Sequence, residues 1–69
     1  MQIRMKHVRA ANLCSRGARE WFRRYGLDYN VFLTEGYPES VILGTGDALG
    51  RIVVDTAHKM SAEADDGEK

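Results

Sequence analysis

Three arginines in the first half of the chain are spaced so that they can face one way. Arg16, Arg19 and Arg23 lie three and four positions apart, so a helix would align them opposite an apolar stripe. A row of guanidinium groups can neutralise the phosphates of a nucleic acid. A surface helix presents the same stripe to solvent, with Glu20 pairing with arginines four positions away, and we favour this reading. The candidate anion or nucleic-acid face comprises Arg9, Arg16, Arg19, Arg23 and Arg24.

Cys14, the single cysteine, is the one residue of the chain that could act as a thiol nucleophile. Such a site would need His7 or His58, which lie far apart in the sequence, and no neighbour marks the thiol as activated. We therefore expect Cys14 to be a small buried residue near a helix start, with reactivity at an exposed helix N-terminus as the alternative. A single cysteine excludes an intramolecular disulfide. The prediction is a protein that is not an enzyme and that has no catalytic residue, metal site or cofactor.

The glycines of "SVILGTGDALG", residues 40–50, suggest a nucleotide-binding loop at first sight. The spacing from Gly44 through Gly46 to Gly50 is one residue longer than that motif requires, and Asp47 would repel a pyrophosphate. We interpret these glycines as residues that end one helix and separate it from the next, with Thr45 as the N-cap of the last helix.

Caps and glycines predict four or five short helices. Ser15 and Asp28 can cap the starts of two helices. Gly26 can end one helix in the left-handed conformation, and Gly36 ends the next. The helices are expected over residues 5–12, 15–25, 28–36 and 38–43 and from Thr45 to about residue 60.

Apolar residues at helical spacing predict which faces are buried. In the second helix these residues are Ala18, Trp21, Phe22 and Tyr25. In the last helix they are Leu49, Ile52, Val53, Thr56 and Met60. The predicted core is Val8, Leu13, Trp21, Phe22, Tyr25, Leu27, Phe32, Leu43, Leu49, Ile52 and Val53.

The two short helices over 28–36 and 38–43 have the connection of a helix-turn-helix unit. The second of them has no Arg, Lys, Asn or Gln to read base edges, and its one charge is the acidic Glu39. We therefore do not expect this element to read DNA. Tyr29 and Tyr37 could instead form an exposed aromatic pair and are the candidate protein-contact residues.

The composition, 43% hydrophobic and 29% charged, is typical of a globular protein, and 69 residues allow one domain with a small core. The sequence has neither a membrane-spanning run nor the apolar core of a signal peptide, so we expect a cytoplasmic protein without membrane contact. Residues 1–25 carry seven bases and one acid, whereas 26–69 carry three bases and nine acids. Such segregation can favour self-association, docking of the acidic end on the basic half, or an anionic partner.

Residues 14–49 resemble a group of short uncharacterised proteins encoded in tailed-phage and prophage gene clusters. The shared pattern is Cys-x-x-Gly-x-Arg-x-Trp-Phe at 14–22, Gly-Leu-Asp at 26–28 and Thr-Gly-Asp-Ala at 45–48. The resemblance covers about half of the chain. It implies a phage context and no established activity.

The sequence as a whole predicts an all-α protein, with a single helical domain over residues 1–60 and a disordered acidic tail over 61–69. We expect a non-enzymatic accessory protein of phage or prophage type that binds an unidentified protein partner, phage-encoded in that context, or a second copy of itself. The alternative is a small nucleic-acid-binding module that uses the arginine face.

Overall fold

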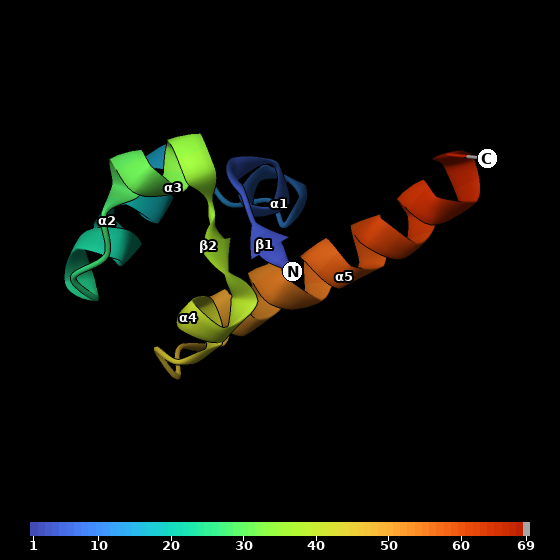
Figure 1. Cartoon of the computed structure of the whole chain (residues 1–69). Coiled ribbons are helices and arrows are strands. Elements are labelled where there is room, and N and C mark those ends of the chain that lie inside the picture. The colour runs from blue at the N-terminus through green and yellow to red at the C-terminus, as the bar shows by residue number, and fades with distance from the viewer. Residues whose placement is uncertain (69) are drawn as a thin grey trace.

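The computed structural model describes the backbone of residues 1–68 and the side chains of residues 1–62. Five helices account for most of this part of the chain, as the sequence predicts (Figure 1). They are α1 (Met5–Ala10), α2 (Ser15–Arg24), α3 (Tyr29–Glu35), α4 (Glu39–Leu43) and α5 (Ala48–Glu68). None of the helices in the described residues could cross a lipid bilayer.

Two short strands, β1 (Gln2–Ile3) and β2 (Tyr37–Pro38), form an antiparallel pair that the sequence did not predict. Ile3 lies opposite Tyr37, and the pair joins the start of the chain to the connection between α3 and α4 (Figure 1). Gly36 allows this close approach, since a Cβ there would lie 2.7 Å from the carbonyl oxygen of Ile3. Two residues per strand give no period-2 pattern to detect.

Several helices begin or end at the capping residues and glycines that the sequence predicts. Gly26 has φ +70°, and the amide of Leu27 donates to the carbonyl of Phe22 at 2.8 Å, which closes α2 in a Schellman motif. Asn12, with φ +65°, closes α1 in the same way. Asp28 caps α3 by accepting hydrogen bonds from two backbone amides. The expected ends at Gly26 and Gly36 and the cap at Asp28 are confirmed.

Two predicted caps are wrong by a short shift along the chain. Cys14, not Ser15, is the N-cap of α2, where its Sγ accepts from the amide of Gly17 at 3.3 Å. Asp47, not Thr45, caps α5 by accepting from the amide of Leu49 at 2.8 Å. The Thr45 hydroxyl is used one turn earlier, because it donates to the carbonyl of Ile42 at 2.8 Å.

The core is an aromatic cluster centred on Phe22. Its ring lies 4.5 Å from that of Phe32 and 5.3 Å from that of Trp21. Aliphatic side chains from both ends of the chain surround these rings. The buried hydrophobic residues are Ile3, Val8, Ala18, Trp21, Phe22, Phe32, Ile42, Val53, Val54 and Ala57.

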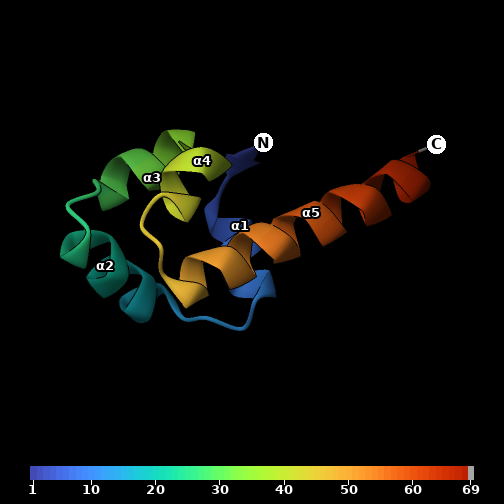
Figure 2. The same cartoon turned by 90° about the horizontal axis from the view of Figure 1, so that it is seen from below.

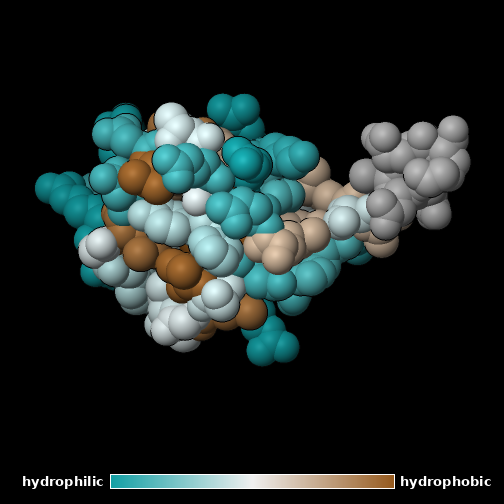
Figure 3. Space-filling model, viewed as in Figure 1, coloured by the Kyte–Doolittle hydropathy of each residue, from teal (hydrophilic) through white to brown (hydrophobic). Residues whose placement is uncertain are grey.

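The predicted buried face of α5 is wrong by about one residue. The helix packs through Gly50, Val53, Val54 and Ala57, and it leaves Ile52 47% exposed. Leu49 is also exposed, as is Leu43 on α4. Figure 3 shows that apolar side chains reach the surface on the face of the molecule that it views. The inner face of α5 differs from the predicted one because small residues let this helix approach its neighbours closely. A Cβ on Gly50 would lie 3.1 Å from atoms of both Ile42 and Trp21.

Helix α5 projects past the other helices (Figures 1 and 2), and the molecule measures 39 × 22 × 20 Å. Helix α5 continues beyond residue 60, where the sequence predicts the end of the domain. Residues 61 and 62 continue the helix. The rest of the predicted acidic tail, from residue 63, lies outside the residues whose side chains the structure describes.

Candidate functional site

The arginine face predicted from the sequence lies on the outside of α2. Arg16, Arg19 and Arg23 are all exposed, on the side of the helix opposite the buried Trp21 and Phe22. Arg24 is exposed at the end of the same helix, and Arg9 is exposed on α1. The exposure that the spacing predicts for Arg16, Arg19 and Arg23 is confirmed.

Two of these arginines have partners within the protein. Arg23 Nη1 lies 3.4 Å from Glu20 Oε2, an i,i+3 pair in place of the expected i,i+4 pairs. Both side chains are largely exposed, so this pair contributes little to stability. The guanidinium carbon of Arg19 lies 5.6 Å from the centre of the Tyr29 ring, which is within the range of a cation–π contact.

Tyr29 and Tyr37, the candidate protein-contact pair, are half-buried and pack against the core. Tyr37 stacks on Phe32 with ring centres 6.3 Å apart, and its hydroxyl accepts from the amide of Asp28 at 2.9 Å. The ring of Tyr29 packs edge-on against Phe22 at 5.9 Å. The prediction that Tyr29 and Tyr37 form an exposed pair is therefore wrong, because both rings pack onto the aromatic cluster.

Cys14 is exposed, contrary to the prediction that it is buried, because the N-cap position places it at the surface. His7 is buried, and its Nδ1 accepts from the amide of Arg4 at 2.8 Å. Burial, together with the nearby charges of Lys6 and Arg4, lowers the pKa of His7. His7 bonds to the amide of Arg4 and His58 to the carboxylate of Glu39, and no hydrogen bond among the described residues joins either histidine to the thiol.

His58 belongs to a charged cluster that the sequence analysis missed. Its Nε2 lies 2.6 Å from Glu39 Oε1, and the N-terminal ammonium of Met1 lies 3.4 Å from Glu39 Oε2. The hydrogen bond from His58 is the main reason that the pKa of Glu39 is lowered. The cluster joins the start of the chain, α4 and α5. Its members are too far apart in sequence for any local pattern to reveal them.

The Glu39–His58 pair lines a groove of about 580 Å³ between α4 and α5. Asp47, Arg51 and Asp55 also line it, so acidic and basic groups alternate along its wall. Among the described residues, no group of three or more His, Cys, Asp or Glu side chains is arranged to hold a metal ion. In this groove the Glu39–His58 contact ties α4 to α5.

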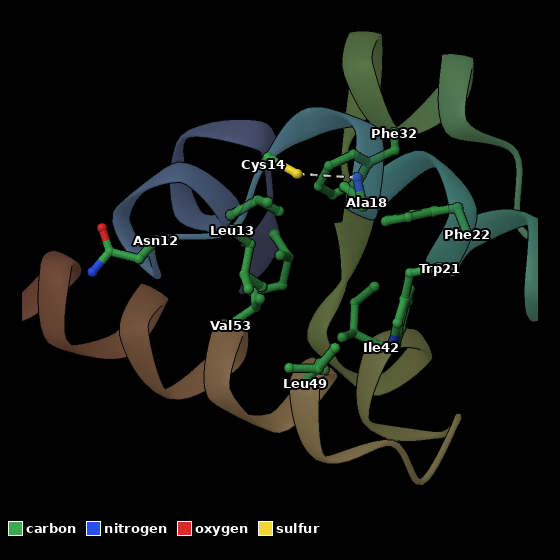
Figure 4. A pocket seen from close by; sticks show the side chains of 14 residues that line it. Asn12, Leu13, Cys14, Ala18, Trp21, Phe22, Phe32, Ile42, Leu49 and Val53 are labelled. Carbon is green, nitrogen blue, oxygen red and sulfur yellow. Dashed lines mark hydrogen bonds between the residues drawn. The ribbon is translucent and has the colours of Figure 1, made fainter.

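The most distinctive concave feature is an apolar cleft of about 330 Å³ between α2 and α5 (Figure 4). Leu13, Trp21, Ile42 and Val53 converge on it from four different segments, and Leu49 lies at its edge (Figure 4). Small residues deepen it, because Gly17, Ala18 and Gly50 also belong to its lining. None of the described lining residues is charged. We refer to this feature as the apolar cleft.

Sequence reasoning identifies only part of this cleft. It finds the apolar stripe of α2 but interprets Gly50 as a residue that separates two helices, whereas in the structure Gly50 lies at a close contact between helices. The prediction therefore missed both the inner face of α5 and the space beside it.

Comparison of the chain with protein-family models, with curated proteins and with solved structures finds no match. The resemblance to proteins of phage gene clusters thus stays a prediction from the sequence pattern.

Proposed function

We propose that this protein is a non-enzymatic accessory protein of phage or prophage type that acts by binding another protein through the apolar cleft. The observation that carries this proposal is the cleft itself, an uncharged apolar hollow between α2 and α5. A domain of this size gains stability from every apolar contact it can close. An apolar hollow left open is therefore a candidate contact site.

The chemistry of the cleft supports a protein partner over a polar metabolite. Small-molecule sites combine apolar walls with a few polar groups that orient the ligand. The polar side-chain groups of the described lining belong to Asn12, Cys14 and Trp21. The Cys14 sulfur already accepts a hydrogen bond from Gly17, and the Trp21 indole N–H is buried without a hydrogen-bond partner among the described residues. Apolar side chains of a partner need no such orientation. They act as anchors when they fill a pocket and exclude water.

The surface next to the cleft supports the same assignment. Leu49 contributes to the lining and is itself 44% exposed. Ile52, one turn further along α5, is 47% exposed. An apolar centre with polar residues around it is the usual anatomy of a protein interface.

Site-specific photocrosslinking tests this function. A photoreactive amino acid is placed at Ile52, beside the cleft, and in a second variant at Leu33, which is equally exposed at 48% but lies on α3. In cells that naturally produce the protein, position 52 should form discrete crosslinks to protein that position 33 does not form. Identical patterns from both positions, or no crosslink from position 52, would contradict the proposal.

A second candidate function is binding of a nucleic acid backbone, and the exposure of all five predicted arginines favours it. The test is an NMR titration with a short DNA duplex and with single-stranded RNA, at low and at physiological salt. Phosphate binding predicts shifts at Arg16, Arg19 and Arg23 that persist at physiological salt and weaken in an Arg19→Glu variant. Loss of the shifts on modest salt addition would leave these arginines as a solvated face.

A further inference from the structure

Helix α5 carries two apolar faces, and the domain covers only one of them. The inner face packs against the rest of the chain, with Ala57 fully buried. The second face is exposed or half-buried, and we call it the α5 flank. Its members are Leu49, Ile52, Thr56 and Met60. A helix that is apolar on two sides is suited to contact two neighbours, and its own domain supplies one.

The α5 flank and the apolar cleft form one continuous surface, because Leu49 belongs to both. One surface thus holds both a hollow and the exposed apolar side chains that could fill such a hollow. A two-fold interface requires this combination, since each copy must offer to its partner what it receives. The occupant that fits the cleft is therefore already present on the chain, as the side chains of Leu49 and Ile52.

The distribution of charge fits an antiparallel arrangement of two copies. The Tyr25 hydroxyl bonds to Asp47, so the end of α2, with Arg23 and Arg24, lies beside the start of α5. The sequence beyond Ala62 is acidic, with Glu63, Asp65, Asp66 and Glu68. Two antiparallel α5 helices would bring the acidic end of each toward the basic end of the other. The net charge of zero adds no overall repulsion between copies.

We propose that the partner on the apolar cleft is a second copy of this chain, bound through the α5 flank in an antiparallel, two-fold pair. This inference rests on the proposed function, because it names the protein that fills the same cleft. Each copy would insert Leu49 and Ile52 toward the cleft of the other.

Such a pair would need to cover only a limited share of the surface of each copy. A standard stable interface buries about 800 Å² on each partner, roughly one sixth of the 4725 Å² that this chain exposes. Helix α5 has 21 residues, a length of about 31 Å at 1.5 Å per residue. The α5 flank, from Leu49 to Met60, occupies about 17 Å of this length, and the rim of the cleft continues it from Leu49.

Sedimentation equilibrium of the full chain tests the inference. The unmodified protein should sediment as a dimer at high concentration. Ile52→Glu should raise the dimer dissociation constant about tenfold or more, because it places a charge in the interface. Leu33→Glu, with the same exposure on α3, should leave the dissociation constant unchanged. Circular dichroism shows whether each variant keeps its helices, and Ile52→Ser shortens the side chain without adding a charge if Ile52→Glu does not fold.

Two results would overturn the inference. One is a protein that stays monomeric at about 1 mM, where even weak self-association is populated. The other is a dimer that Ile52→Glu and Ile52→Ser leave intact or that Leu33→Glu disrupts. Neither result removes the proposed function, because crosslinks from position 52 to a different protein would still support it.

Discussion

The hydroxyl of Tyr25, at the end of α2, donates a hydrogen bond to the carboxylate of Asp47, at the start of α5. This bond raises the pKa of Tyr25 and is the largest cause of the lowered pKa of Asp47. Asp47 is also the N-cap of α5 through the amide of Leu49. One carboxylate thus fixes both the start of α5 and its contact with α2, and this contact holds one side of the apolar cleft in place.

Replacing Tyr25 with phenylalanine should lower the melting temperature by about 4–8 °C, the effect of one net hydrogen bond in a domain of this size. The acid sensitivity should change as well. Because the pKa of Asp47 is lowered in the folded state, its stabilising effect is present above its ordinary pKa of 3.8 and is lost as the pH falls below it. Tyr25→Phe should therefore lose less stability on acidification than the unmodified protein.

Tyr29→Phe is the matched control for this prediction. The Tyr29 hydroxyl contacts only the sulfur of Met5, at 3.9 Å, among the described residues. Its removal should change the melting temperature little and leave the acid dependence unaltered. Equal losses in the two variants would contradict the role given to Asp47. The measurement is thermal unfolding followed by circular dichroism at neutral and acidic pH.

The buried His7 should give the stability of the fold a second pH dependence, at higher pH than that of Asp47. Burial is the main cause that lowers its pKa from the ordinary 6.5, so the neutral imidazole stabilises the fold. This contribution is complete above pH 6.5 and is lost as the pH falls through the lower folded pKa. Protonation also removes the acceptor for the amide of Arg4.

A His7→Asn variant should remove this pH dependence, since its amide oxygen can accept from the Arg4 amide and does not titrate. Urea unfolding at pH 7 and pH 5 measures the difference. The unmodified protein and a His58→Ala control should both be less stable at pH 5, whereas His7→Asn should change less. A His7→Asn protein with the full acid loss would show that another group is responsible.

The parts of the fold that sequence reasoning predicted are those set by neighbours along the chain. The stripe of α2, the left-handed Gly26 and the cap at Asp28 each depend on residues within one or two turns. The pairing of β1 with β2 and the Glu39–His58 contact depend on residues far apart, and no local pattern encodes them.

The face of α5 fell between these two cases. Its period was predicted correctly, but the largest apolar side chains were expected inside. The packing is instead set by the smallest residue, Gly50, which lets α5 approach Ile42 and Trp21. The apolar cleft follows from the same contact and was missed for the same reason.

The contact with His58 should determine how the carboxyl group of Glu39 titrates. His58→Ala removes the hydrogen bond that is the main cause of the lowered pKa of Glu39, so this pKa should rise toward its ordinary value of 4.5. Carboxyl-carbon NMR measures the change directly. Lys59→Ala, which removes a formal charge from the next residue of α5, should leave the titration of Glu39 nearly unchanged. Equal shifts in both variants would indicate a general charge effect and not the specific contact.

Two glycine-to-alanine changes test the packing that shapes the cleft, and they should have opposite signs. Alanine is favoured over glycine in helices by about 1 kcal/mol. At Gly17 a Cβ would meet only the sulfur of Cys14 at 3.5 Å, an ordinary contact, so Gly17→Ala should raise the free energy of unfolding by about 0.5 kcal/mol near the helix start.

At Gly50 the added Cβ would lie 3.1 Å from the carbonyl oxygen of Ile42 and 3.1 Å from the Trp21 ring. Neither the backbone of α4 nor the buried indole can move aside easily, and overpacking of this kind costs about 1–3 kcal/mol. The cost exceeds the gain in helix propensity, so Gly50→Ala should lower the free energy of unfolding measured in urea. If Gly50→Ala instead stabilises the protein as Gly17→Ala does, then α5 can move away from α4 and α2. In that case the close approach at Gly50 does not determine which face of α5 is buried.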